Sequence, residues 1–222
     1  MITKNLQDIK ASLPENVTLV AVSKTKPIAD LQEAYDAGQR IFGENKIQEM
    51  VDKFDALPKD IKWHMIGHLQ SNKVKYMAHF VDLIHGVDKF KTLKEINKQA
   101  KKHNRVINCL LQARIAKEDT KFGLSFNEIE TILESTELND LENIKIVGFM
   151  GMATFTEDQE QLKEEFLLLK NFFDKHKKNT VTANCKLSVL SMGMSGDYKL
   201  AIQNGSSMIR VGSSIFGNRN YN

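Results

Sequence analysis

Cysteine is scarce in this chain of 222 residues, which holds only Cys109 and Cys185. The two form no CxxC motif and no other metal-binding spacing. Cys109 lies inside the apolar run "RVINCLLQARI", where a free cysteine behaves as a small core residue. Disulfides persist in oxidising compartments, so two unpatterned cysteines predict a reducing one and no cysteine-based metal site.

Long hydrophobic runs are also missing. The N-terminal stretch "MITKNLQDIKASLP" alternates charged with single apolar residues and lacks the apolar h-region of a signal peptide. No stretch approaches the ~20 apolar residues that a bilayer-spanning helix requires. Net charge is only +3, and the densest basic run, 175–178, closes an expected helix, where cations favour the helix dipole. We therefore expect a cytoplasmic protein with no membrane or nucleic-acid partner.

Linkers and low-complexity segments are absent too, and the chain instead alternates short apolar runs with helical patterns. Composition is ordinary for a globular protein, with 41% hydrophobic and 27% charged residues. Ser125 and Glu128 have capping-box spacing, and Thr156 with Gln159 is expected to open a long helix. An N-terminal helix precedes eight strand-like runs: "VTLVAVSK", "RIFGE", "KWHMIG", "VDLIHGV", "RVINCLLQARI", "IKIVGFMGM", "LSVLSMGM" and "MIRVG".

The alternation predicts an α/β fold with a parallel sheet. The runs are continuously apolar, as expected for strands that are covered on both faces. Eight strand–helix units within 222 residues indicate a single (β/α)8 TIM-type barrel domain spanning residues 1–222. An open doubly wound sheet is the alternative, but the first strand is not followed by the GxGxxG of a dinucleotide fold.

Two lysines follow the first expected strand, in "LVAVSKTKP". Active sites of such barrels lie at the carboxyl ends of the strands. If the strand persists that far, alternation puts Lys24 and Lys26 on the same side, with Lys26 nearer the rim. A lysine amine in a low-dielectric site beside another cation becomes a nucleophile that forms Schiff bases with carbonyl compounds. The alternative is that both side chains reach out to solvent.

The last two loops suit a phosphate group, which barrels of this class often bind after strands seven and eight. Here they read "SMGMSGD" and "RVGSS", with Ser195 and Ser213 expected at helix starts and Gly212 allowing close backbone approach. Together with a Schiff-base lysine they predict a phosphate-bearing aldehyde, and pyridoxal 5'-phosphate (PLP) fits. Arg210 can only donate, which suits a pyridine nitrogen; a surface ion pair is the alternative.

The motifs "AVSKTKP", "FGENKIQE", "WHMIGHLQSNK", "KFG", "SMGMSGD" and "IRVGSSIFG" occur in the order typical of one family. Over essentially its whole length the chain resembles the pyridoxal phosphate homeostasis proteins. The resemblance implies the barrel of the alanine racemase N-terminal domain, a fold-type III PLP architecture. It also implies residue roles. Lys24 holds PLP as an internal aldimine, Arg210 faces the pyridine nitrogen, and Asn45 lies beside the ring. The phosphate is bound by Ser195, Gly212 and Ser213, while Lys26 and Lys121 match lysines that help cofactor release or transfer.

Two histidines in "KWHMIGHLQ" have the spacing of a helical metal pair, His64 and His68. We predict no metal there, because Gly67 lies between them and the stretch has the pattern of a strand followed by a turn. His64 is instead expected to be a pocket-wall residue after the third strand.

Three functions are compatible with these residues. The first is a PLP-binding homeostasis protein that carries the cofactor without a dedicated reaction, with PLP-dependent apoenzymes as recipients. The second is an amino acid racemase, which needs a base on each face of the cofactor. Alanine racemases take one base from a tyrosine of a C-terminal β domain. The chain ends at Asn222 without such a domain, so we expect the carrier, as a monomer. The third is a Schiff-base aldolase without a cofactor, which would lack the aldimine chromophore.

Overall fold

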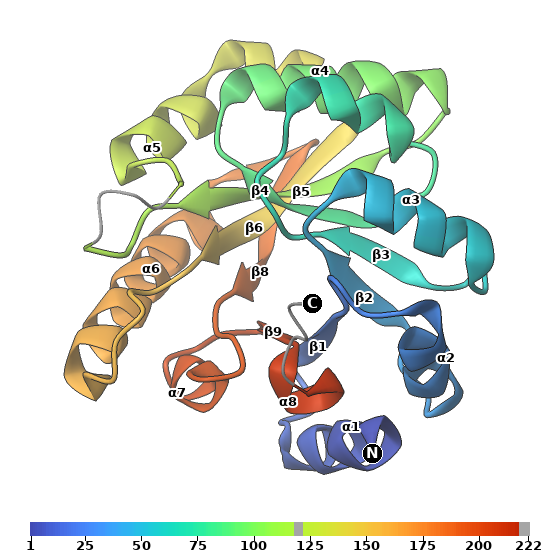
Figure 1. The fold of residues 1–222 in the computed structure, drawn as a ribbon. Coiled ribbons are helices and arrows are strands. Elements are labelled where there is room, and N and C mark those ends of the chain that lie inside the picture. Colours follow the sequence, from blue (N-terminus) through green and yellow to red (C-terminus); the bar gives the residue numbers. More distant parts are fainter. Residues whose placement is uncertain (118–121, 218–222) are drawn as a thin grey trace.

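Eight parallel strands close into a barrel in the computed structural model, which describes residues 1–117 and 122–217 (Figure 1). The strand order is β6-β5-β4-β3-β2-β1-β9-β8, and β6 also pairs with β8 to close the ring. This confirms the predicted TIM-type barrel and excludes the open sheet. The strands are β1 (Thr18–Val22), β2 (Ile41–Glu44), β3 (Lys62–Met65), β4 (Leu83–Val87), β5 (Ile107–Ala113), β6 (Ile144–Gly151), β8 (Cys185–Ser191) and β9 (Met208–Val211).

Helices surround the barrel on its outer face (Figure 1). They are α1 (Ile2–Ser12), α2 (Ile28–Asp36), α3 (Ile47–Ala56), α4 (Phe90–Lys102), α5 (Phe126–Glu134), α6 (Gln159–Asn179), α7 (Tyr198–Gln203) and α8 (Ser213–Phe216), with the 3-10 helices η1 (Ser71–Tyr76) and η2 (Thr136–Asp140). The N-terminal α1 packs against α8, where Asn5 donates to the Ile215 carbonyl at 3.1 Å. Of the helices in the described ranges, none combines the length and hydropathy that crossing a bilayer requires.

Two local expectations were wrong. A two-residue strand, β7 (Val181–Thr182), pairs antiparallel with β8 and is too short to leave a sequence pattern. Helix α6 is capped by Asp158 instead of Thr156, because the Asp158 carboxylate accepts from the backbone N–H groups of Glu160 and Gln161 at 3.0 and 3.1 Å. The expected long helix is present, and its apolar stripe is buried: Leu162, Phe166, Leu169 and Phe173.

The alternation of side chains along each strand divides the core into two layers. On β3, Trp63 and Met65 point outward into the larger cluster, which fills the space between barrel and helices. The smaller cluster fills the barrel interior and consists of Val20, Leu83, Leu110, Met150 and Met208. Cys109 is wholly buried in the outer layer, as predicted. Because the interior is packed with side chains, a ligand has access only to the ends of the barrel.

Candidate functional site

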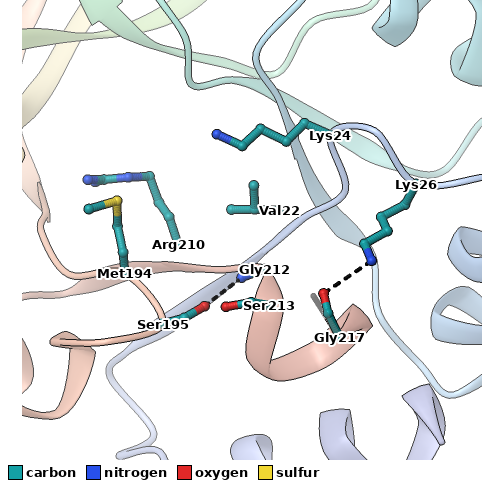
Figure 2. Close-up of a pocket in the computed structure, with 9 residues that line it drawn as sticks. All are labelled: Val22, Lys24, Lys26, Met194, Ser195, Arg210, Gly212, Ser213 and Gly217. Carbon is teal, nitrogen blue, oxygen red and sulfur yellow. Dashed lines mark hydrogen bonds between the residues drawn. The ribbon is translucent and has the colours of Figure 1, made fainter. Parts of the chain in front are cut away.

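A pocket opens at the carboxyl ends of β1 and β9 (Figure 2). The two strands pair with Val20 opposite Arg210, so the segments that follow them emerge side by side. The loop after β8 completes the wall. The structure therefore brings together five predicted cofactor residues and one accessory lysine: Lys24, Ser195, Arg210, Gly212, Ser213 and Lys26.

The two lysines belong to a turn and not to the strand. β1 ends at Val22, and Lys26 N–H donates to the Ser23 carbonyl at 3.1 Å across the turn. Thr25 has the left-handed φ of 62°, which is uncommon for a residue other than glycine. The strand does not persist as far as the lysines, so strand alternation does not align them, although both line the pocket. Lys24 extends towards Arg210, whereas Lys26 Nζ donates to the carbonyls of Phe216 and Gly217 at 2.9 and 3.1 Å (Figure 2).

A buried ion-pair network holds this turn in place. Lys53 Nζ donates at 2.7 Å to three oxygens, which belong to the Ser23 carbonyl, Glu44 and Glu49. Ser23 Oγ donates to the same Glu44 oxygen at 2.6 Å, and Thr25 N–H donates to Glu49 at 2.5 Å. Helix α3 and the end of β2 therefore fix the backbone on both sides of Lys24. This network was not predicted from the sequence, where its one local signal is the i, i+4 spacing of Glu49 and Lys53.

Glu44 sits in this network as a fully buried carboxyl group. Burial raises its pKa, and the opposing effects of the Lys53 cation and the Ser23 hydroxyl do not fully compensate. Its second oxygen, Oε2, has no hydrogen-bond partner among the described residues. A buried carboxylate without full pairing is costly, so the stability of the turn depends strongly on Lys53.

The phosphate-side residues are joined to one another. Gly212 N–H donates to Ser195 Oγ at 3.1 Å (Figure 2). Ser213 opens the single-turn α8 as predicted, but Ser195 lies three residues before α7, whose N-cap is Asp197. A Cβ atom at Gly212 would lie 3.1 Å from the Val22 carbonyl oxygen and 3.2 Å from Val22 Cβ. Glycine at this position therefore allows the ends of β1 and β9 to approach closely.

Arg210 points from β9 into the barrel interior and is only 4% exposed. Its Nη1 donates to the carbonyl and the hydroxyl of Ser191 at 2.9 and 2.6 Å, and its Nη2 donates to the Gly151 carbonyl at 3.0 Å. Burial lowers the pKa of the guanidinium to about 10, against an opposing effect of Asp197, so it is protonated at neutral pH. The surface ion pair considered from sequence is therefore excluded.

The pocket has the charge and donors that an anionic ligand requires. Lys24, Lys26 and Arg210 contribute three cationic groups, and no carboxylate occurs among the described residues that line it. Three of the five N–H donors of Arg210 are engaged by protein oxygens, which leaves two for a ligand acceptor. An amine, a guanidinium and a serine–glycine cradle are a donor set that fits a phosphorylated aldehyde with an acceptor nitrogen.

Two predicted residues lie outside this pocket, and a third is not among the described residues. Asn45 lines a separate depression together with Met65, His68, Gln70 and Lys73, and not the pocket of Lys24. His64 lies within β3 instead of after it, buried in the barrel interior, and does not line the Lys24 pocket. Lys121 lies outside the described residues.

Comparison with known proteins agrees with this geometry. The family model described as "Alanine racemase, N-terminal domain" matches residues 1–220. The pyridoxal phosphate homeostasis protein of Aquifex aeolicus is 37% identical over 204 residues, which cover 91% of this chain and 87% of that protein. The one of Synechocystis sp. is 39% identical over 214 residues, covering 96% of each chain.

Solved structures extend the comparison. PipY of Synechococcus elongatus without PLP superposes with a TM-score of 0.91 at 33% identity, covering 98% of this chain and 100% of PipY. The same protein with PLP bound gives a TM-score of 0.88 at 34% identity. An alanine racemase of Clostridium difficile shares the fold, with a TM-score of 0.77 at 16% identity, and this chain covers 57% of it. The chain therefore belongs to the alanine racemase N-terminal domain family and, within it, to the pyridoxal phosphate homeostasis proteins.

Proposed function

We propose that this chain is one PLP-binding barrel domain, residues 1–222, that holds the cofactor and acts in intracellular PLP homeostasis without a dedicated reaction. The observation that carries the proposal is the convergence of Lys24, Arg210 and the Ser195–Gly212–Ser213 cradle on one cationic pocket. Relatives at 37–39% identity that match nearly full-length are named pyridoxal phosphate homeostasis proteins, and PipY has been solved with PLP bound.

Lys24 is assigned the covalent role. Its amine would form a Schiff base with the aldehyde carbon of a bound PLP, with loss of one water molecule. The Lys53 network supports this role, because it fixes the backbone on both sides of Lys24. Lys26 is assigned an accessory role: it adds positive charge at the same pocket and ties the turn to the end of α8. Lys121 is kept as a second accessory lysine on the family resemblance alone.

The phosphate is assigned to Ser195, Gly212 and Ser213, which offer hydroxyl and backbone donors at one side of the pocket. The pyridine nitrogen is assigned to Arg210. PLP supplies an electron sink when its nitrogen is protonated. Because the guanidinium only donates, its hydrogen bond requires an unprotonated nitrogen and so weakens that sink. This chemistry suits holding the cofactor better than using it. Asn45 is kept as a ring-side neighbour on the family resemblance alone, since it lines a separate depression.

The recipients are proposed to be PLP-dependent apoenzymes, and the protein is proposed to be a cytoplasmic monomer. These proposals come from the sequence. The monomer is also supported by the structure, in which the barrel closes within one chain and needs no second copy to complete its sheet. Sedimentation analysis of the loaded protein tests the monomer. Incubation with an apoenzyme behind a dialysis membrane, compared with direct mixing, tests whether transfer requires contact.

The covalent assignment is tested on the full chain. Protein incubated with PLP is reduced with borohydride, and peptide mapping locates the pyridoxyl group. We expect it on Lys24, with no adduct in Lys24→Ala and a normal adduct in the control Lys26→Ala. A group found only on Lys26 or Lys121 would overturn the assignment.

The distinction between carrier and enzyme needs a second measurement. The PLP-loaded protein is assayed for racemisation and decarboxylation of amino acids. We expect rates no higher than those of free PLP. Turnover at enzymatic rates would favour the racemase alternative. A protein that develops no absorbance of a lysine adduct with PLP would favour the cofactor-free aldolase.

A further inference from the structure

A chain of buried polar side chains runs through the barrel interior behind Arg210. Ser191 on β8, His85 on β4 and His64 on β3 are each at most 3% exposed. His85 Nδ1 lies 3.1 Å from Ser191 Oγ, and His85 Nε2 lies 3.0 Å from His64 Nδ1. Arg210 Nη1 is 2.6 Å from Ser191 Oγ at one end, and Asp82 Oδ2 is 3.5 Å from His64 Nε2 at the other.

The two ends of this chain lie at opposite ends of the barrel. Arg210 lines the pocket at the carboxyl ends of the strands. Asp82 immediately precedes β4, at the amino ends of the strands, and its side chain is 43% exposed. These hydrogen bonds therefore link the pocket to the opposite, solvent-exposed end of the barrel, past the apolar cluster of the interior.

The chemistry of the end groups gives the chain a direction. A guanidinium only donates, so Ser191 Oγ accepts from Arg210 and its own hydrogen is available for His85 Nδ1. His85 then carries its proton on Nε2 and donates to His64 Nδ1. His64 in turn carries its proton on Nε2 and donates to Asp82. Every hydrogen bond then points from the cation to the carboxylate.

The reverse direction is disfavoured at the Asp82 end. It would place the lone pair of His64 Nε2 against the lone pairs of the Asp82 carboxylate, whose Oδ2 is 3.5 Å away. A charged His64 is disfavoured as well, since burial lowers the pKa of His64 and lowers that of His85 strongly. Two neutral rings with Nε2 protons satisfy every group in the chain.

We propose that Asp82, His64, His85 and Ser191 are positioning residues for Arg210. Asp82, as the terminal acceptor, fixes the tautomers of both histidines, and so keeps the Ser191 lone pair directed at the guanidinium. Buried polar groups need hydrogen-bond partners in any protein, but that need alone does not fix which group of each pair donates. The proposed direction makes a residue at the far end of the barrel control the hydrogen bonding at the pocket. The effect on ligand affinity rests on the proposed function, whereas the prediction of the histidine tautomers does not depend on it.

Nitrogen-15 NMR of the histidine rings tests the tautomers in the full-length protein without added ligand. At pH 7 we expect both His64 and His85 to be neutral with the proton on Nε2. Asp82→Ala removes the terminal acceptor and should move part of the proton population to Nδ1 on both rings. Asp82→Asn keeps an acceptor oxygen and should preserve the native tautomers. His79 lies outside the hydrogen-bond chain and is the internal control, because its tautomer should not change.

Two results would overturn the proposal: an Nδ1 proton on His85 in the native protein, or unchanged tautomers in Asp82→Ala. A role limited to filling space predicts that second result.

Affinity for PLP tests the consequence at the pocket. Ser191→Ala removes an acceptor from a buried cation and should weaken binding ~tenfold, within the range for hydrogen bonds to charged groups. Ser206→Ala is the matched control, because Ser206 is equally buried beside β8 and β9 but bonds only backbone groups. Equal affinities for the two variants would refute the positioning role of Ser191. If the native protein binds no PLP but shows the expected tautomers, the proposed function fails and the hydrogen-bond chain stands.

Discussion

Lys53→Met is expected to be one of the most damaging single substitutions outside the pocket itself. Lys53 is only 4% exposed and makes three hydrogen bonds of 2.7 Å. Methionine has a similar length and fills the space, but it donates nothing. The substitution leaves the Glu44 carboxylate buried without its cation, and it removes one of the two donors to the Ser23 carbonyl, the other being Lys26 N–H. Both losses fall on the turn that carries Lys24.

The magnitude follows from the burial of the pair. Removing one partner of a buried ion pair costs ~3–5 kcal/mol, mainly because the other charge stays buried without compensation. For a chain of this size, ~1 kcal/mol lowers the melting temperature by ~2–4 °C. The expected loss is therefore on the order of 6–20 °C. Adding Glu44→Gln removes the stranded charge and should restore part of that loss.

The penalty should depend on pH in a defined direction. The pKa of Glu44 is raised in the folded protein above its usual value of 4.5, chiefly by burial. A carboxyl group with a raised folded pKa favours the folded state at low pH, and this contribution is lost as pH rises through the folded pKa. Without the Lys53 cation, that pKa rises further. The difference in stability between native protein and variant should be smallest at acidic pH and grow towards neutral pH.

Thermal and urea unfolding at several pH values measure these quantities, and PLP titration of the folded variant measures the effect on the pocket. Lys101→Met is the matched control, because Lys101 lies in the last turn of α4, as Lys53 does in α3, but is exposed. A Lys53→Met protein within about 1 kcal/mol of the native stability at pH 7 would refute the reasoning, since buried pairs cost more than that to break. So would a penalty that does not change with pH.

Three further predictions concern the pocket and the core. Ser195→Ala should weaken PLP binding by roughly 1 to 3 kcal/mol, because one hydroxyl is lost while the backbone donor of Gly212 remains; an unchanged dissociation constant in calorimetry would place the phosphate elsewhere. Nitrogen-15 NMR of labelled PLP should give an unprotonated pyridine signal in the native protein at neutral pH and a protonated one in Arg210→Glu; a protonated native signal contradicts the role of Arg210. Burial raises the pKa of the Cys185 thiol to about 11 and also raises the pKa of the Cys109 thiol. Ellman's reagent at pH 8 should therefore react with both thiols only after unfolding. Rapid reaction of the native protein would contradict their burial.

The sequence alone determined the order of the strands and helices. It also indicated that the functional residues lie at the carboxyl ends of the barrel strands. Apolar runs covered on both faces identify parallel strands, and eight of them in one chain fit a closed barrel. Lys24, Ser195 and Ser213 were predicted from their place after a strand, Arg210 was predicted from its place at the end of one, and all four line the pocket. This succeeds because the carboxyl ends of all barrel strands converge on one end, so local position along the chain already gives the location in space.

Only the tertiary structure decided which side chains meet across the barrel. His85 and Ser191 are 106 residues apart, and their contact depends on the direction in which each strand presents its side chains. The support of the Lys24 turn by Lys53 depends on how α3 packs against the end of β2, and Thr25 in that turn has a left-handed φ and donates to Glu49. Such contacts leave no periodic signal, because hydrogen bonds between distant segments depend on packing geometry and not on local spacing.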